Sequence, residues 1–376
     1  GDLYGYGSPL HRNISILLGE QTGGLQGIPV YAVPQAEAGT SAAKVMTITP
    51  SGTATGAGVH TIVIEGEYGV LGQSYDIAIA VGDTASTICP KITTAISAVL
   101  ACPFTLTDSG GVSTATAKYQ GLTSNDLKIR VDTGNYGSLG ISYSIATTTA
   151  GSGSPTVTTG LTNLSNNWFP FILSCYPTGN TAALTAFETW NGVADPKVPT
   201  GRYVGNVWKP SIVFVGTNAD DPTSVTNASG RKNQMTLSFC PAGLGENLPS
   251  VYAANVCKLW ALCAQNTPHL DIQNQPYPDA APPVSGSIPA MNDYTVRDTY
   301  VKAGCSTVVL KNGTWYAKDS VTTYHPDGEN PPAYRYVRNL ILDMNVFHGY
   351  KLLYDKYVMG KTICNDTDRV SASDII

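Results

Sequence analysis

The triplet Gly360-Lys361-Thr362 is the part of this sequence that comes nearest to a catalytic motif, because it matches the end of a phosphate-binding P-loop. A complete P-loop reads Gly-x-x-x-x-Gly-Lys-Ser/Thr and connects a strand to a helix, so that backbone N–H groups converge on a phosphate. Here Asp355 stands in place of the first glycine, and the triplet follows a predicted helix instead of leading into one. The pattern therefore predicts a helix that ends at Gly360, with Lys361 beside the negative end of its dipole, and no nucleotide site.

Other catalytic and metal-binding patterns are also incomplete. Ser41 and Lys44 match Ser-x-x-Lys, but the companion motifs of those enzymes are missing. The run 365–374 (NDTDRVSASD) has spaced carboxyl groups but lacks the glycine and the final glutamate of a calcium loop. The five histidines have no partner at metal-ligand or acid–base spacing: His11, His60, His269, His325 and His348. We predict no catalytic residue, cofactor or metal, although a site built from residues distant in sequence is invisible at this level.

The eight cysteines form no Cys-x-x-Cys pair, and none has a histidine at zinc-ligand spacing. Cys175 and Cys240 each end an apolar run typical of a strand, and Cys257 and Cys263 lie in a helix-like stretch. These positions predict reduced thiols in a buried core, as in a protein synthesised in the cytoplasm. The other four are Cys89, Cys102, Cys305 and Cys364.

The composition argues against two classes of partner. Only 13% of the 376 residues are charged, with a net charge of −5, whereas soluble proteins carry roughly a quarter charged residues. We therefore predict no cationic surface for nucleic acid or anionic lipid. We also predict no membrane span, because no apolar run reaches about 18 residues.

Abundant Thr, Ser, Gly and Asn are typical of β-rich proteins in assemblies, with an exported β-rich domain as the alternative. The first residue is Gly1, so we expect a processed or truncated chain.

The first 45 residues are predicted to be extended, with a strand at 27–34 (GIPVYAVP). Beyond them the apolar residues alternate, which predicts strands at 60–67, 73–81, 104–108, 114–121, 127–132 and 140–151. Asp83 is predicted to cap a helix, and the stretch 147–155 to be an exit linker. The predicted apolar faces of strand 73–81 and of the helix consist of Tyr75, Ile77, Ile79 and Val81, and of Ile88, Ile92, Ile96 and Val99.

After residue 160 short apolar strands alternate with helices, which is typical of a layered α/β core. The predicted strands are 169–175, 210–216 and 235–240, and the predicted helices are 181–190 and 248–266. A further helix is predicted between Asp293 as its cap and Gly304 as its end, followed by a hairpin with a type I′ turn at Asn312-Gly313. A last helix is predicted over 333–359, with an apolar stripe of Val337, Leu340, Ile341 and Met344.

The predicted fold class is α+β or α/β: a layered α/β core domain with an inserted β-rich domain. Residues 1–45 and 160–376 would form the discontinuous core, including a C-terminal domain at about 285–376. Residues 46–159 would form the insertion, with one helix. An insertion is the simplest interpretation, because the β-rich stretch interrupts a pattern that resumes after it.

The C-terminal third has a particular order of features that resembles a known family. A Pro-rich loop and a capped helix precede AGCSTVVLKNGTWYAKDSVTTYHPDGENPPAYRYVRNLILDMNVFHGYKLLYDKYV. This hairpin, polar loop and long Tyr- and Arg-bearing helix resemble the C-terminal domain of contractile-tail sheath proteins, especially those of Mu-like phages. Upstream, GYGSPLHRN followed by an apolar strand is similar to the start of a sheath core. The run from HTIVIEGEYGV to NDLKIRV is similar to the β-rich domain that many of these sheaths carry as an insertion.

The resemblance implies a structural, non-enzymatic subunit that needs no nucleotide or other cofactor. Sheath subunits assemble as stacked hexameric rings around an inner tail tube, and they contract to drive the tube through the host envelope during genome ejection. The implied partners are other copies of the chain, the tube protein, and the baseplate and tail terminator proteins, with no nucleic acid and no membrane insertion. The implied location is the virion tail of a bacteriophage, assembled in the host cytoplasm. Family members extend beyond both ends of this sequence, so we expect much of both linking arms to be absent.

The resemblance also indicates where contacts would lie. The final helix belongs to the domain that faces the tube, which implies tube or subunit contacts for Arg335, Arg338, Lys351, Lys356 and Lys361. An ordinary solvated helix face is the alternative for each of them. Tyr334, Tyr336 and Tyr350 are expected to be packing residues.

Several other functions remain open at this stage. The sheath of an R-type bacteriocin or of a contractile injection system would use the same kind of subunit, and a type VI secretion sheath is less favoured because two different chains build it. An α/β hydrolase-like enzyme with a β-rich appendage is the alternative from another class. It would need a clustered Ser/His/Asp site in a cleft. A non-contractile capsid or adhesion protein is the third alternative.

Overall fold

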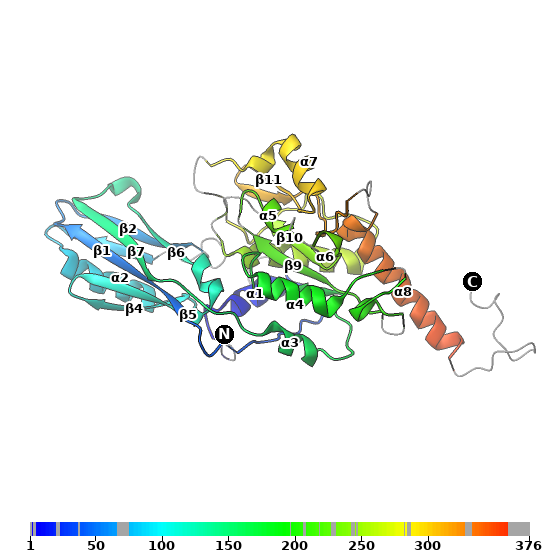
Figure 1. Ribbon diagram of the computed structural model, residues 1–376. Coiled ribbons are helices and arrows are strands. Elements are labelled where there is room, and N and C mark those ends of the chain that lie inside the picture. Colours follow the sequence, from blue (N-terminus) through cyan, green and yellow to red (C-terminus); the bar gives the residue numbers. More distant parts are fainter. Residues whose placement is uncertain are drawn as a thin grey trace, which may run out of the picture.

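The computed structural model describes residues 2, 5–19, 23–36, 38–65, 75–195, 197–205, 208–217, 219–226, 231–241, 245, 247–281, 283, 287–327 and 333–359. Helices and strands are mixed along the chain, which confirms the predicted α+β class. Figure 1 shows two parts side by side: antiparallel sheets with helix α2 (Ala85–Ser97) at one end, and a helix-covered parallel sheet at the other. Helix α8 (Val337–Tyr357) extends from the second part, away from the first.

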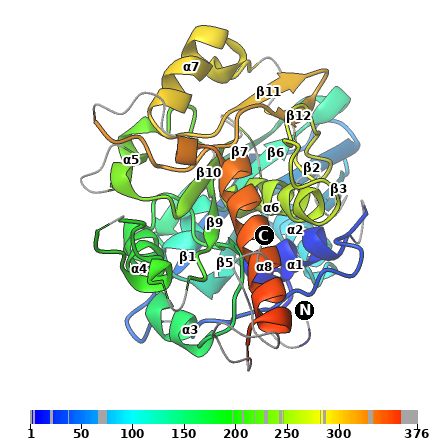
Figure 2. The same cartoon turned by 90° about the vertical axis from the view of Figure 1, so that its right-hand side faces the viewer.

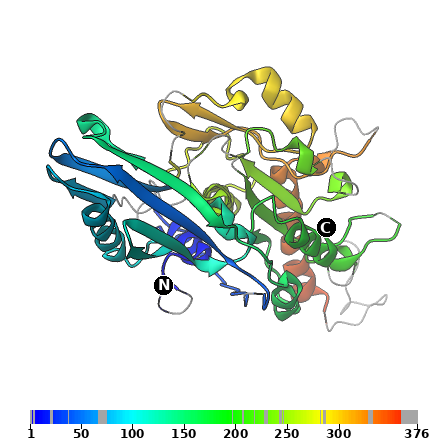
Figure 3. The same ribbon diagram turned by 60° about the vertical axis from the view of Figure 1, so that its left-hand side comes forward.

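The antiparallel part contains two sheets, with strand orders β4-β5-β1-β7 and β3-β2-β6. Their strands are β1 (Ala43–Gly52), β2 (Gly58–Glu65), β3 (Tyr75–Ile79), β4 (Phe104–Ser109), β5 (Val112–Gln120), β6 (Lys128–Asp132) and β7 (Ile141–Thr149). Figure 3 shows β1 and β7, which pair antiparallel, running together along this part. Every strand predicted between residues 60 and 151 is present, and the predicted exit linker begins only after Thr149, the end of β7.

Strand β1 has no counterpart in the sequence predictions, because a lysine and a proline interrupt its apolar pattern. Lys44 is buried on the same face as Met46 and Ile48. Its Nζ donates hydrogen bonds to the carbonyl oxygens of Asn125 and Leu127, which satisfies the charge inside the fold. A lysine buried in this way cannot be told from an exposed one by its position in the sequence.

The core of the antiparallel part forms where α2 packs on the sheets. The predicted apolar residues of β3 and α2 are buried together: Tyr75, Ile77, Ile79, Ile88, Ile92 and Ile96. Val81 was expected on the same face, but β3 ends at Ile79 and Val81 is 69% exposed. The predicted cap is also shifted by one residue, since Thr84 precedes the helix and its N–H donates to Thr87 Oγ1. Asp83 instead accepts a bond from Ala80 N and pairs with Lys91.

The other part is built on a three-stranded parallel sheet of order β10-β9-β8, covered on both faces. The strands are β8 (Phe171–Leu173), β9 (Ile212–Thr217) and β10 (Leu237–Pro241), and the covering helices include α4 (Thr181–Asn191) and α6 (Pro249–Asn266). Side chains of β9 alternate between the layers, with Val213 and Val215 toward α4 and Ile212 and Phe214 toward α6. The predicted layered α/β arrangement is therefore present.

Gly216 lets α6 approach the sheet closely. A Cβ atom at this position would lie 1.6 Å from the carbonyl oxygen of Pro249, in the first turn of α6. Because both neighbours are backbone, no side-chain movement could relieve that overlap. The glycine therefore sets how near the longest buried helix lies to β9.

The remaining elements surround this sheet. They are α1 (Pro9–Leu18), α3 (Val157–Asn163), α5 (Thr223–Thr226), α7 (Tyr294–Lys302), the hairpin of β11 (Val308–Lys311) and β12 (Thr314–Ala317), and α8. Short 3₁₀ turns occur at η1 (Leu122–Asp126), η2 (Gly134–Tyr136), η3 (Gly201–Tyr203), η4 (Arg231–Asn233), η5 (Ala290–Asn292) and η6 (Ala333–Arg335).

The prediction of an extended start is wrong for residues 9–18, which form α1. Ser8 Oγ accepts a hydrogen bond from His11 N at 3.2 Å, and Pro9 occupies the first turn, which together start a helix. The strand predicted at 27–34 is wrong as well. This segment joins no sheet in the described part of the chain, and Pro29 and Pro34 have no N–H for a ladder.

The C-terminal predictions are largely confirmed. Asp293 Oδ1 accepts a bond from Thr295 N at 2.7 Å at the start of α7, and Asn312 and Gly313 both have positive φ, as a type I′ turn requires. Helix α8 begins at Val337 and not at residue 333, because residues 333–335 form the turn η6. The helix end predicted at Gly360 lies outside the described residues.

The chain enters and leaves the antiparallel part at adjacent points. Ala42 N donates to Ser152 O at 3.0 Å, and Ser152 N donates to Ala42 O at 3.1 Å. A short bridge thus joins the two connections directly before β1 and after β7. Two neighbouring connections are what an inserted domain requires.

Two further observations bear on the predictions from composition. None of the described helices combines the length and the apolar character that crossing a membrane would require. Seven of the cysteines lie in the described residues and are free thiols, and most of them are buried: Cys89, Cys102, Cys240, Cys257 and Cys305. Cys364 lies outside the described residues.

Candidate functional site

The residues that match the Ser-x-x-Lys pattern do not face each other. Ser41 Oγ donates to the carbonyl oxygen of Ala38 at 2.5 Å. Lys44 Nζ donates to two other carbonyl oxygens, those of Asn125 and Leu127. Both side chains are used in separate structural contacts, so they form no nucleophile–base pair.

The histidines are likewise separated from one another. His60 is fully buried, with Nδ1 at 2.7 Å from Tyr143 Oη and Nε2 at 3.0 Å from the Gly137 carbonyl oxygen. Burial lowers the pKa of His325, whose Nδ1 lies 2.7 Å from the Thr323 carbonyl oxygen. His11 packs against Tyr6, His348 packs against Trp168, and His269 is exposed. Across the described ranges, no three His, Cys, Asp or Glu residues gather as a metal site would require.

Two buried ion pairs connect elements of the core. Lys258 Nζ of α6 lies 2.7 Å from Asp279 Oδ2, and both side chains are almost fully buried. Arg231 Nη1 lies 2.8 Å from Glu188 Oε2, and burial raises the pKa of Glu188 while Arg231 opposes that rise. In both pairs opposite charges are in direct contact within the fold, which is a structural role, although Glu188 Oε1 and Arg231 Nε have no hydrogen-bond partner among the described residues.

The first half of α8 packs on the body of the protein. The predicted stripe of Val337, Leu340, Ile341 and Met344 is buried in one cluster that includes Trp260 and Trp315. Farther along the helix, the Phe347 ring lies 3.9 Å from the Trp208 ring, measured between centroids. These contacts set the direction in which the helix leaves the body, and Figure 2 shows α8 at the front of that end of the molecule.

The second half of α8 is almost entirely exposed. From residue 345 to 357 only Phe347 is even half-buried. A second apolar stripe, here called the outer stripe, runs at steps of four, four, three and four residues. It consists of Leu342 (41% exposed), Val346 (64%), Tyr350 (50%), Leu353 (57%) and Tyr357 (45%).

The outer stripe lies on the face of α8 opposite the buried stripe. At about 3.6 residues per turn, the centre of the outer stripe lies roughly half a turn around the helix from the centre of the buried stripe, and Val346 lies about 160° from Met344. A long helix with two opposed apolar faces, one packed and one free, is expected to bind another surface. The outer stripe is therefore the strongest candidate for a functional site in the described residues.

The predicted cationic contact residues have different environments. Arg338, Lys351 and Lys356 are exposed on α8. Arg335 is 8% exposed, and its Nε points inward to the carbonyl oxygen of Tyr324 at 3.4 Å. Lys361 lies outside the described residues. Three of the five cations are thus exposed on the same helix, but they are spread along its length and do not form one cluster.

The tyrosines near these cations are more exposed than expected for packing residues. Tyr334 is 48% exposed and Tyr350 is 50% exposed, whereas Tyr336 is half-buried. The expectation that all three pack inside the fold is wrong for Tyr334 and Tyr350. Tyr350 lies in the outer stripe, where a partner and not the core would cover it.

The outer stripe was missed by the analysis of the sequence, although its spacing is visible there. Leu342, Val346, Tyr350, Leu353 and Tyr357 satisfy the same helical period as the stripe beginning at Val337. Two overlapping apolar stripes on one helix would have predicted either a fully buried helix or a helix with a second partner.

Comparisons with known proteins show which proteins this chain is similar to. No family model matches the sequence. The chain is similar to the Mu-like prophage FluMu tail sheath protein of Haemophilus influenzae, with 23% identity over 351 residues, or 90% of this chain. It spans 65% of that curated relative's own length. This relative confirms the resemblance to the tail sheath proteins of Mu-like phages.

Two solved structures are also similar to the chain. A sheath tail protein from Desulfitobacterium hafniense has 12% identity and a TM-score of 0.39, with 95% of this chain and 72% of that chain covered. A sheath tail protein from Listeria innocua has 13% identity and a TM-score of 0.35, with 87% of this chain and 66% of that chain covered.

Proposed function

We propose that this chain is the structural subunit of a contractile phage tail sheath. It would assemble as stacked hexameric rings around an inner tube and contract to drive the tube through the host envelope. The observation that carries the proposal is the sequence match to a Mu-like tail sheath protein over 90% of the chain. The chain spans 65% of that relative's length, so the assembly of this chain and its partners are stated here as proposals.

The proposed role is mechanical and not enzymatic. A heterologous contact whose rotation does not close generates an open helix, so one kind of subunit can build a long tube. Contraction would be a switch between two packings of the same subunits, and no nucleotide is required. An energy difference of even ~1 kcal/mol per copy becomes decisive when many copies switch together. The implied partners are the inner tube, the baseplate and the tail terminator, in a virion tail assembled in the host cytoplasm.

We propose that residues 1–45 and 160–376 form the sheath core, with its C-terminal domain at about 285–376, and that residues 46–159 are an insertion. The reciprocal hydrogen bonds between Ala42 and Ser152 support this division, because they bring the two connections together. Strand β1 begins at Ala43, so the boundary is best moved to this bridge. The apolar core continues across it through Ile16, Leu248 and Val251, which would hold the insertion firmly.

Helix α8 is the proposed contact element toward the tube or a neighbouring subunit. Arg338, Lys351 and Lys356 are its exposed cations, and they would meet acidic groups on a partner. Arg335 is left out because it is buried, and Lys361 stays a proposal from the sequence. Charges at the rim of an interface mainly steer association and set its dependence on salt.

Electron microscopy of the negatively stained full-length protein after overexpression tests the proposal. Striated tubes or short contracted cylinders are the expected result. Dispersed particles under conditions that assemble a related sheath would overturn it. R-type bacteriocins and contractile injection systems would give the same particles, and the neighbouring genes distinguish them.

A second test addresses the cations of α8. The triple charge reversal Arg338→Glu, Lys351→Glu and Lys356→Glu should slow association with purified tube protein roughly tenfold or more at low salt. The same number of charge reversals at exposed lysines elsewhere, Lys197→Glu, Lys302→Glu and Lys311→Glu, is the control and should have much less effect. Equal rates for the triple variant and the control, in biolayer interferometry at several salt concentrations, would remove α8 from the tube contact.

A further inference from the structure

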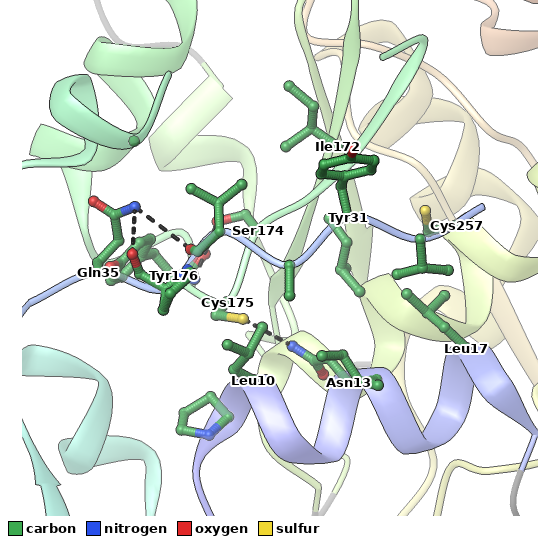
Figure 4. Close-up of a pocket in the computed structure, with 18 of the residues that line it drawn as sticks. Leu10, Asn13, Leu17, Tyr31, Gln35, Ile172, Ser174, Cys175, Tyr176 and Cys257 are labelled. Carbon is green, nitrogen blue, oxygen red and sulfur yellow. Dashed lines mark hydrogen bonds between the residues drawn. The ribbon is translucent and has the colours of Figure 1, made fainter. Parts of the chain in front are cut away.

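An open groove of about 820 Å³ lies between α1, the extended segment 27–35, α6 and the edge of β8. Figure 4 shows Leu10, Asn13 and Leu17 of α1 on one side of it and Tyr31 and Gln35 of the extended segment on the other. Its volume lies within the roughly 300–1,000 Å³ over which proteins enclose whole ligands. The groove is therefore large enough to receive several side chains of a partner.

The walls of the groove contain no charged residue among the described residues that line it. Two buried oxygen atoms in these walls also have no hydrogen-bond partner in the described part of the chain. They are Asn13 Oδ1, on a residue that is 1% exposed, and Tyr119 Oη, on a residue that is 8% exposed. Asn13 Nδ2 donates to Cys175 Sγ at 3.2 Å, which leaves its oxygen available as an acceptor. A buried acceptor without a donor calls for a donor from outside the described residues, such as an ordered water or a bound group.

The outer stripe of α8 has the complementary chemistry. It carries three aliphatic side chains, no charge, and two tyrosine hydroxyl groups that can donate hydrogen bonds, those of Tyr350 and Tyr357. It spans about 22 Å along the helix at 1.5 Å per residue. The stripe is thus an apolar ridge with donors, and the groove is an uncharged depression with acceptors.

The ridge and the groove of one chain cannot meet. The buried stripe anchors the first half of α8 to the cluster around Trp260 and Trp315, so the outer stripe on the opposite face points away from the body. Turning it toward the groove would expose Ile341 and Met344. A second copy of the chain can supply the missing surface to both.

We propose that the outer stripe of α8 in one copy docks into the groove between α1, segment 27–35 and β8 of the next copy. This contact rests on the proposed function, because it is one of the subunit contacts that such an array needs. It joins two different surfaces of the same chain, so each copy can bind one neighbour through its ridge and another through its groove, and the contact can repeat through many copies.

Pairing of the stripe with itself in two copies is the main alternative occupant. It would give a closed dimer and would leave the groove and its two buried oxygens uncovered. The heterologous contact, repeated through an array, covers both the stripe and the groove of each copy, and it is favoured because apolar surface of both kinds is then removed from water.

A pair of matched leucines tests the ridge. Leu353 and Leu352 are 57% and 56% exposed, but only Leu353 lies in the outer stripe. Leu353→Glu should weaken self-association by at least roughly tenfold, because it buries a carboxylate with no partner. Leu352→Glu should associate like the wild-type protein. Sedimentation velocity over a range of concentrations measures both, and circular dichroism checks that each variant folds.

A second pair tests the groove. Val30 is half-buried in the groove wall and packs partly against Leu17 and Leu25, so circular dichroism must show that Val30→Glu folds before its association is compared. It should weaken self-association as much as Leu353→Glu does. Val198→Glu changes a valine that is 68% exposed outside both surfaces, and it should have no effect.

Mixing the two defective variants is the decisive experiment. Leu353→Glu retains an intact groove and Val30→Glu retains an intact ridge, so one good contact forms in each mixed pair. Each variant alone should sediment as a monomer and the equimolar mixture as a dimer. A photoreactive p-benzoylphenylalanine in place of Leu353 should cross-link to segment 27–35 of another copy, identified by mass spectrometry.

The proposal is overturned if the mixture stays monomeric, if Leu352→Glu is as defective as Leu353→Glu, or if Val30→Glu associates normally. The last outcome, with cross-links from one stripe to another, would assign the stripe to self-pairing.

These measurements of self-association can be made whether or not the protein assembles into tubes. Tubes formed by both defective variants would reject this contact and leave the sheath proposal standing, whereas a wild-type protein without tubes would reject the sheath proposal.

Discussion

Helices α6 and α8 are the two longest helices of the described chain, and they are used in opposite ways. Helix α6 has 18 residues, of which 12 are buried, including Lys258. Helix α8 has 21 residues, of which four are buried. Both helices have apolar residues on all of their faces, together with lysine, so the two sequences are similar in the types of residue they contain. Helix α6 lies against the parallel sheet along its length, while α8 touches the body only with its first half.

This difference shows that apolar content does not decide whether a helix belongs to the core. Helix α6 is covered because β9 lies on one side and later segments of the chain lie on the other. Helix α8 is the last described helix, so no later described element folds over its outer stripe. An exposed apolar stripe at the end of a helix that is packed at its start is therefore a candidate surface for a partner.

The largest expected effect concerns the lysine that α6 buries. Lys258→Met removes one charge of an almost fully buried pair, and the carboxylate of Asp279 then loses the ammonium group 2.7 Å from its Oδ2. We expect a loss of about 3–5 kcal/mol in the free energy of unfolding, measured by urea denaturation. Lys356→Met on the exposed half of α8 is the matched control, and it should change that free energy by less than about 0.5 kcal/mol.

The double variant Lys258→Met with Asp279→Leu sharpens this result. Replacing both charges by apolar groups should restore most of the lost stability, because no unpaired charge stays buried. If Lys258→Met alone is as stable as the wild-type protein, then solvent reaches the pair of Lys258 and Asp279, and the pair is not buried beside α6.

The two halves of α8 should differ almost as strongly. Ile341 is 1% exposed, and Ile341→Ala should cost about 2–4 kcal/mol of unfolding free energy through lost burial and the cavity it leaves. Leu353→Ala in the outer stripe should leave the free energy of unfolding of the monomer within about 0.5 kcal/mol of the wild type. Similar losses from both substitutions at a concentration where the protein is monomeric would mean that the outer stripe is covered within its own chain.

The smallest expected effect is a pH dependence at the start of α6. Asp126 lines a small cavity with Leu248, Pro249 and Ser250, and burial raises its pKa to about 6. Lys44 and Lys128 oppose this rise. The folded state therefore binds the proton more tightly than the unfolded chain does. The stability that Asp126 contributes is fully present below the unfolded pKa, near 4, and is lost as pH rises to about 6.

Asp126→Asn removes this titration. Relative to the wild type, the variant should gain about 1–2 kcal/mol in unfolding free energy between pH 4 and pH 7, allowing for the partial exposure of the group. Urea denaturation at a series of pH values measures the difference. Parallel pH profiles for the two proteins would show that Asp126 is well solvated beside α6.

Much of the fold could be predicted from local patterns. Strands with regular alternation, such as β3, and helices with one apolar stripe, such as α2, were predicted because burial of one face leaves a period in the sequence. The I′ turn at Asn312-Gly313 follows from the positive φ that those residues tolerate. Two elements were not predicted, for specific reasons. Lys44 interrupts the apolar alternation of β1, and the start of α1 depends on Ser8 as its N-cap.

The candidate site was predicted only in part. The sequence pointed to α8 and to its cations, but burial of Arg335 depends on the carbonyl oxygen of Tyr324, which no spacing reveals. The groove is formed by α1, segment 27–35, α6 and β8, which are far apart in sequence. Its uncovered acceptor, Asn13 Oδ1, could be recognised only once its neighbours were known.

By itself, the sequence determined the mixed class of the protein, most of its strands and helices, and its resemblance to sheath proteins, because each of these is written in local periodicity and in the order of motifs. Only the tertiary structure decided which apolar residues are core and which are free. The physical reason is that burial depends on what the rest of the chain places against a surface. The first half of α8 packs in the cluster around Trp260 and Trp315, while the side chains of the outer stripe are 41–64% exposed.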